Sequence, residues 1–259
     1  MPVNQAAPML EHTLIDLLSD MRSRVKVTAS LTERISLTRD IALFLLAFYS
    51  MHRGYDLFFI LRSQILELPK SRGLIFNFQF GKTLRASSEA VVLLADRDCP
   101  AVFAFRAVTA YVSAAQRMGW DLTAGHLFHV FTTEGGWGNL PFPAARMTTA
   151  LQAHLRTAGL PSHFTMHSFR VGGPFSKSLT GTAVDEIMKI GGWKTESVAT
   201  YYIGPPLAKT CTVARENAAR ATRARSSCHC RLSFKTTSQH VRDRIDENAK
   251  KGRVRQPRA

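Results

Sequence analysis

Residues 165–204 read TMHSFRVGGPFSKSLTGTAVDEIMKIGGWKTESVATYYIG, the densest run of chemistry-bearing side chains in the chain. His167 and Arg170 stand three residues apart, so a helix brings the imidazole and the guanidinium onto one face. A proton-transfer group beside a planar, anion-binding cation suits phosphoryl chemistry. A His-x-x-Arg pair alone also occurs as an ordinary contact on a helix surface, so the surrounding residues must decide between the two interpretations.

Hydrophobic periodicity around this run predicts an α+β chain that is mostly helical and carries a small antiparallel β-sheet or hairpin. The expected helices cover 10–25, a buried stretch from a cap at Ser36 or Thr38 to about residue 51, 101–118, 143–158, 167–179, 184–190 and 197–202. The expected strands cover 73–80 and 90–94 as a hairpin and 127–131 alone, and glycines predict a loop over 135–141.

Charge is the most informative feature of the composition. The chain of 259 residues has 34 basic and 19 acidic side chains, a net charge of +15. Residues 208–259 hold 14 basic and four acidic side chains, so most of the excess lies in this segment. Such a balance predicts a polyanionic partner, and nucleic acid before a membrane surface. No apolar run approaches the ~20 residues of a membrane-spanning helix, and four cysteines are too few for a disulfide framework.

Further residues extend the pattern upstream and downstream. Arg53 follows the apolar segment IALFLLAFYSMH, and Lys82 lies in FGKTL between the two hairpin strands. Trp193 closes a Gly-Gly-Trp triplet, and Tyr202 follows it nine residues later. With the His-x-x-Arg pair, this layout resembles the catalytic domain of the tyrosine recombinases (the phage-integrase family), in the Cre-like variant with Trp in the Gly-Gly-Trp box. The resemblance covers about residues 36–204.

The resemblance implies DNA strand cleavage and rejoining through a 3′-phosphotyrosine intermediate, in site-specific recombination or integration of a mobile element. It implies a metal-independent reaction without a cofactor. The implied active-site residues are Arg53, Lys82, His167, Arg170, Trp193 and Tyr202, with Asp56 in a supporting position.

The implied roles follow from the chemistry of the side chains. Arg53 and Arg170 would stabilise the pentavalent phosphorus transition state, and Trp193 would donate its indole N–H to a non-bridging oxygen.

The remaining side chains would handle protons. Lys82 would protonate the leaving 5′-oxygen, and His167 would act as base or hydrogen-bond partner near the Tyr202 hydroxyl. Asp56 would orient Arg53 or His167.

Several alternatives stay open. Arg85 is close enough to compete with Lys82, and Tyr201 competes with Tyr202 as the nucleophile. At the level of function, the alternatives are a non-catalytic DNA-binding remnant of such an enzyme, a type IB topoisomerase-like DNA relaxer, and a basic protein that coats nucleic acid through its tail. The Cys228-His229-Cys230 triplet is a poor zinc frame because no second ligand pair accompanies it.

The sequence divides into three segments. We expect a short helical N-terminal remnant or linker at 1–35, the catalytic domain at 36–207, and a basic, disordered tail at 208–259. The expected partner is double-stranded DNA, on which the chain forms a homo-tetramer, and we expect no membrane and no small-molecule cofactor. The expected location is intracellular and DNA-associated, in the nucleus of a eukaryote or the cytoplasm or nucleoid of a bacterium or phage.

Pro174 predicts a kink within one turn of Arg170, in the helix expected over 167–179.

Overall fold

The computed structural model describes residues 6–78, 89–95, 102–120, 125–131 and 137–203. The helices within these ranges are α1 (Glu11–Val27), α2 (Leu31–Ser50), α3 (Gly54–Phe58), α4 (Val102–Arg117), α5 (Ala144–Thr157), α6 (Met166–Leu179), α7 (Val184–Gly191) and α8 (Glu196–Ile203), with 3-10 turns at Arg62–Gln64 and Pro69–Ser71. The strands are β1 (Ile65–Glu67), β2 (Gly73–Phe78), β3 (Glu89–Leu94), β4 (His129–Phe131) and β5 (Trp137–Pro141). No described helix combines the length and the apolar composition that crossing a bilayer requires.

Helix α2 is the centre of the fold. It packs against α1, α4 and α6, and every residue from Ile41 to Ser50 is buried. The expectation of a buried helix here is confirmed, but its predicted start is wrong. Ser30 caps α2 by accepting a hydrogen bond from the backbone N–H of Glu33 at 3.3 Å, while Thr38 lies inside the helix and donates to the Arg34 carbonyl.

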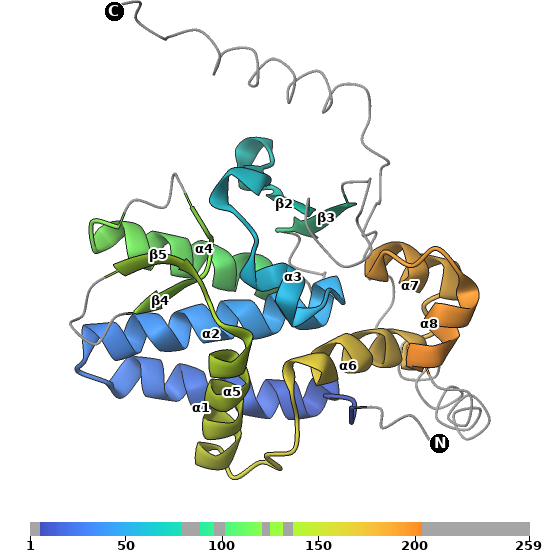
Figure 1. Ribbon diagram of the computed structural model, residues 1–259, viewed down its shortest axis with the longest axis horizontal. Helices are drawn as coiled ribbons and strands as arrows, with labels where there is room; N and C mark the ends of the chain where they lie inside the picture. The colour runs from blue at the N-terminus through green and yellow to red at the C-terminus, as the bar shows by residue number, and fades with distance from the viewer. Residues whose placement is uncertain (1–5, 79–88, 96–101, 121–124, 132–136, 204–259) are drawn as a thin grey trace, which may run out of the picture.

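Helix α1 lies alongside α2 (Figure 1) and covers part of its apolar surface. Leu14, Leu17, Leu18 and Met21 form its buried face, at the spacing that the sequence predicts. These side chains belong to the same hydrophobic core as the residues of α2.

A buried ion pair in α2 links the central helix to its neighbours. Arg39 and Asp40 approach to 2.7 Å, and the Arg39 guanidinium also donates to the His129 carbonyl of β4 at 2.9 Å. The other carboxylate oxygen of Asp40 contacts Nε2 of His154 on α5 at 3.0 Å. Because both charges have partners, their burial is compatible with a stable core.

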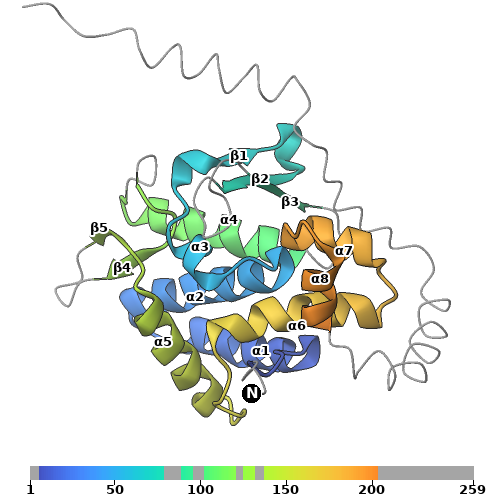
Figure 2. The same cartoon turned by 45° about the vertical axis from the view of Figure 1, so that its right-hand side comes forward.

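Three strands form an antiparallel sheet in the order β1-β2-β3, which lies above α4 in Figure 2. The hairpin predicted from the sequence is confirmed, since Phe78 pairs with Glu89 and Gly73 with Leu94. Strand β1 was not expected. Lys82 and Arg85 lie outside the described residues, between the paired ends of β2 and β3.

A second, two-stranded sheet pairs β4 with β5. The strand expected at 127–131 is confirmed in a shorter form. The loop expected over 135–141 is corrected, because Trp137–Pro141 pairs with β4 across a register shift between His129 and Val130. Glycine and proline at the strand edges account for the weak sequence signal.

Helix α6 approaches two other segments so closely that only glycine fits. A Cβ atom on Gly172 would lie 1.8 Å from the carbonyl oxygen of Met9, and one on Gly173 would lie 2.4 Å from that of Phe48. Helix α6 runs from Met166 to Leu179 and contains Pro174, so the proline does not end the helix, and the kink expected near Arg170 stays a prediction. This packing sets the distance between α6 and the end of α2.

Gly173→Ala is expected to lower the free energy of unfolding by about 2 kcal/mol, because the added methyl group meets backbone rather than a flexible side chain. Urea denaturation measures the change. Thr149→Ala on the exposed face of α5 is the control and should change stability by less than about 0.5 kcal/mol. Equal effects of the two substitutions would contradict the close approach.

Candidate active site

The end of α2 positions the buried guanidinium of Arg170. Met51 caps the helix in the left-handed conformation, with φ of 55°, and its side chain is fully buried. This turn directs the Met51 carbonyl toward α6, where Nη1 of Arg170 donates to it. Burial lowers the pKa of Arg170 and the contact with Tyr202 opposes this shift, so the guanidinium stays charged.

Tyr202 meets Arg170 from α8. Nε of Arg170 donates to the Tyr202 hydroxyl at 3.3 Å, and the guanidinium carbon lies 5.2 Å from the centre of the tyrosine ring. The phenol is 8% exposed, whereas the neighbouring Tyr201 is 43% exposed. Of the two adjacent tyrosines, Tyr202 is therefore the one that faces the buried cation.

Trp193 forms a wall of this cluster. Its ring stacks on that of Tyr202, with centroids 4.8 Å apart and an angle of 8° between the planes. Gly192 ends α7 in the left-handed conformation at φ of 63°, which turns the chain so that Trp193 faces α8. The buried indole Nε1 has no hydrogen-bond partner, which leaves one donor available to a ligand.

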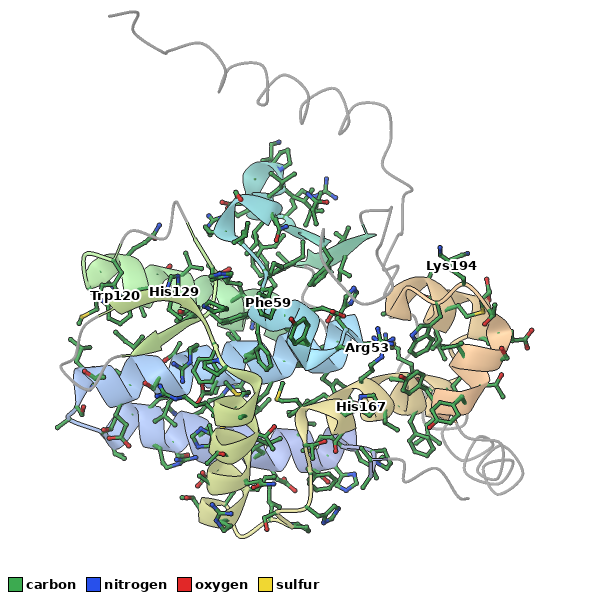
Figure 3. The ribbon with its side chains drawn as sticks, in the orientation of Figure 1. Arg53, Phe59, Trp120, His129, His167 and Lys194 are labelled. Atoms are coloured by element: carbon green, nitrogen blue, oxygen red, sulfur yellow. The ribbon has the colours of Figure 1, made fainter. Side chains whose placement is uncertain are left out.

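Arg53 and His167 border the same cluster (Figure 3). Arg53 precedes α3 and is half-buried, while His167 stands exposed on the first turn of α6. The rings of His167 and Tyr202 lie 5.9 Å apart. Although the imidazole reaches solvent, its partial desolvation, and then the positive charges of Arg170 and Arg53, lower the pKa of His167. A neutral imidazole, able to accept a proton, results at neutral pH.

Asp56 contributes a buried carboxyl group beside Arg53. It is 7% exposed and its Oδ1 has no hydrogen-bond partner. Burial raises the pKa of Asp56, and the nearby His52, Arg53 and Arg170 oppose the shift less strongly. Among the described residues, no ion pair or hydrogen bond joins this carboxylate to the guanidinium of Arg53 or the imidazole of His167.

Sequence reasoning missed His52, which lies directly before Arg53. Its ring is 3% exposed and stacks on Phe78, the last residue of β2, with centroids 4.0 Å apart. Nδ1 of His52 is 2.8 Å from the Ser50 carbonyl, so this nitrogen is the donor. The aromatic contact links the turn that carries Arg53 to the hairpin. Nothing in the local sequence around His52 indicates this contact, because Phe78 is distant along the chain.

Six of the residues singled out in the sequence lie in the described part of the chain, and the fold brings them together from α3, α6, α8 and the turn after α7. Lys82 lies outside the described residues. The members of the described cluster are Arg53, Asp56, His167, Arg170, Trp193 and Tyr202. Two guanidinium groups and an unpartnered indole N–H around one phenol form a positive cradle suited to an anion. No group of three His, Cys, Asp or Glu side chains among the described residues is arranged to hold a metal ion.

No protein-family model and no curated protein matches this chain. Solved structures match its fold. The crystal structure of XerA recombinase aligns with a TM-score of 0.56 at 17% sequence identity, over 87% of this chain and 65% of that one. XerH site-specific recombinase, bound to palindromic difH substrate in a post-cleavage complex, gives 0.57 at 11% identity, over 85% of this chain and 54% of the other.

A lambda integrase dimer bound to a COC′ core site gives a TM-score of 0.52 at 14% identity, over 79% of this chain and 49% of the integrase chain. The chain thus spans about half to two thirds of the length of these structures. The α+β, mostly helical fold expected from the sequence is confirmed, and it is the fold of a tyrosine-recombinase catalytic domain.

Asp56→Asn tests the buried carboxyl group through its pH dependence. The folded-state pKa of Asp56 is raised, so the folded chain binds this proton more tightly than the unfolded chain, and wild-type stability falls as pH rises from the unfolded-state pKa of about 4 through the raised pKa. Asn does not ionise. The free energy of unfolding of the variant minus that of the wild type is therefore expected to increase with pH across this window and to level off above the raised pKa.

Urea denaturation at several pH values measures this difference. Thr149→Ala, which changes no ionisable group, is the control and should show no such trend. A difference that stays constant or decreases with pH would contradict the raised pKa.

Proposed function

We propose that this chain cleaves and rejoins DNA through a 3′-phosphotyrosine intermediate on Tyr202, in site-specific recombination or integration of a mobile element. The observation that carries the proposal is the contact between Nε of Arg170 and the Tyr202 hydroxyl at 3.3 Å, inside a cluster that Trp193 and His167 border. The fold shared with recombinases and integrases supports it.

In the proposed reaction, the phenol oxygen of Tyr202 attacks the scissile phosphorus. A bond forms between this oxygen and phosphorus, and the bond from phosphorus to the 5′-oxygen breaks. The phenol proton passes to His167, whose lowered pKa keeps it neutral and able to accept. The 5′-oxygen takes a proton from Lys82. The phosphodiester energy is kept in the tyrosyl ester, so the reverse attack rejoins the strand without a nucleotide energy source.

The two arginines and Trp193 would stabilise the transition state. Negative charge grows on the non-bridging oxygens as phosphorus becomes pentavalent, and preorganised donors stabilise this charge. Arg170 keeps an unassigned Nη2 after its bonds to Met51 and Tyr202. The indole N–H of Trp193 is buried and unpartnered, and this supports the Cre-like assignment of the Gly-Gly-Trp box.

Lys82 remains the proposed general acid, with Arg85 as its rival. The pairing of β2 with β3 supports a general acid from the segment between these strands, which carries both residues. The stack of His52 on Phe78 supports it further, since it links this hairpin to the turn before Arg53.

At the level of the whole protein, we propose double-stranded DNA as the substrate and a homo-tetramer on DNA as the active assembly. The structures of XerH and lambda integrase hold DNA, and that of lambda integrase is a dimer. The proposed catalytic domain is 36–207, with segment 1–35 supplying α1 and the basic segment 208–259 supplying non-specific affinity for phosphates.

Tyr202→Phe is expected to abolish the covalent protein–DNA adduct while leaving DNA affinity nearly unchanged, because only the hydroxyl group is lost. The assay incubates the protein with nicked duplexes from its own genomic flanks and detects an adduct that survives SDS. Tyr201→Phe is the control and should form the adduct normally. Loss of the adduct in Tyr201→Phe alone would move the nucleophile by one residue, and a wild type without adduct would favour the non-catalytic alternative.

Arg170→Lys is expected to slow cleavage by about 10²–10³-fold, because lysine cannot contact Met51, Tyr202 and a phosphate oxygen in one plane. Single-turnover kinetics measure the rate. Arg156→Lys on the exposed face of α5 should cleave at the wild-type rate. Cleavage by the wild type should persist in EDTA, and a loss in EDTA would contradict charge stabilisation by side chains alone.

A further inference from the structure

A second cavity adjoins the proposed active site. Tyr55, Asp56, Phe59, Leu61 and His126 line this cavity, which is open to solvent on one side and has a volume of about 290 Å³. An engineered cavity of ~150 Å³ in another protein accepts a benzene ring. The cavity in this chain therefore has room for a planar system of two fused rings.

The walls of this cavity are aromatic. Tyr55 lies in α3 and Phe59 directly follows the helix; their rings contact each other at a tilt of 45° with centroids 4.6 Å apart, and the His126 ring meets Phe59 edge-on at 6.1 Å. Tyr55 is 61% exposed, so one aromatic wall reaches solvent. Flat π surfaces of this kind bind planar heterocycles by stacking.

The backbone holds the far side of the cavity in place. The N–H of Leu127 donates to the Ile60 carbonyl at 2.8 Å, and that of Arg62 donates to the Gly125 carbonyl at 2.9 Å. These bonds fix Leu61 against His126, which form an isolated β-bridge. The cavity is therefore built from two chain segments in defined register.

Two buried polar atoms of the residues that line this cavity lack a hydrogen-bond partner, Oδ1 of Asp56 and Nδ1 of His126. Asp56 lines the cavity, is 7% exposed, and its Oδ1 accepts no hydrogen bond. An unsatisfied buried acceptor costs free energy unless a ligand supplies a donor. Among planar heterocycles, adenine, cytosine and guanine carry an exocyclic amino group that could donate to it.

The position of the cavity selects its occupant. Arg53 and Phe59 flank α3 at its two ends (Figure 3), about 9 Å apart at the rise of a helix. A phosphate bound by Arg53 would thus have a neighbouring base within reach of the cavity. Strand exchange unpairs bases beside the cleaved phosphate, and an unpaired base exposes the faces and edges that this cavity matches.

We infer that the cavity formed by Tyr55, Asp56, Phe59, Leu61 and His126 binds one unpaired nucleobase next to the scissile phosphate. This inference rests on the proposed function and adds a base-binding site to it. Stacking on the exposed face of Tyr55 supplies the affinity, and Asp56 favours bases that carry an amino group. The site would stabilise the melted strand between cleavage and rejoining.

The test compares two duplexes of the same sequence, one with a single extrahelical adenine and one with an extrahelical abasic residue at the same place. Binding is measured by fluorescence anisotropy of an end label, with the wild-type protein. We expect the adenine duplex to bind about tenfold more tightly, since stacking contributes this order of affinity for each base. Equal affinities would overturn the inference.

Tyr55→Leu and Phe59→Leu should remove this preference while leaving affinity for the fully paired duplex unchanged. Phe103→Leu, at an exposed aromatic position on α4, is the matched control and should retain the preference. A preference that survives both cavity variants would place the base elsewhere and overturn the inference. Melting temperatures near that of the wild type verify folding.

Two further outcomes are informative. If Tyr55→Leu weakens self-association without DNA, measured by sedimentation, the cavity is an interface between copies of this chain and the inference fails. The adduct assay with Tyr202→Phe separates the two proposals. An adduct without base preference refutes only the base site, and base preference without an adduct refutes only the proposed cleavage.

Discussion

The carbonyl of Met51 is the atom on which the arrangement of the site depends. It ends the buried central helix in a left-handed turn and accepts from Arg170, so one backbone group fixes both the last turn of α2 and the orientation of a buried cation. Arg53 follows this turn by two residues and His52 by one. A change in the turn would therefore displace both arginines together, whereas the loss of one side chain elsewhere in the cluster would remove only one contact.

The glycines of α6 make this arrangement possible. Arg170 reaches the Met51 carbonyl because Gly173 lets α6 touch the backbone of Phe48, one turn earlier in α2. The energetic reason for such close packing is that a buried guanidinium loses its hydration and needs fixed acceptors in return. The cluster supplies two acceptors for Arg170, the Met51 carbonyl and the Tyr202 hydroxyl. The remaining charge is available to an anionic ligand.

Much of this architecture could be predicted from the sequence. Helices with clear apolar periodicity, such as α1 and α6, were predicted within a few residues of their observed ends. The predicted start of α2 was wrong, because the candidate caps Ser36 and Thr38 lie inside the helix and Ser30 caps it instead. Strand β5 was missed because glycine and proline suggest a loop until a partner strand supplies hydrogen bonds. The roles of His52 and the Met51 carbonyl depend on contacts with distant segments, which no local pattern encodes.

The stack of His52 on Phe78 also limits where the hairpin lysine can act. Phe78 is paired with Glu89 and held against the core, so the segment that carries Lys82 is anchored at both ends. Lys82 is the fourth residue after Phe78, and a fully extended chain spans at most about 3.6 Å per residue, so the two Cα atoms stay within about 14 Å of each other. The covalent connection alone therefore restricts how far the proposed general acid can lie from the turn that carries Arg53. Lengthening the segment would dilute the ammonium group without altering a single side chain of the cluster.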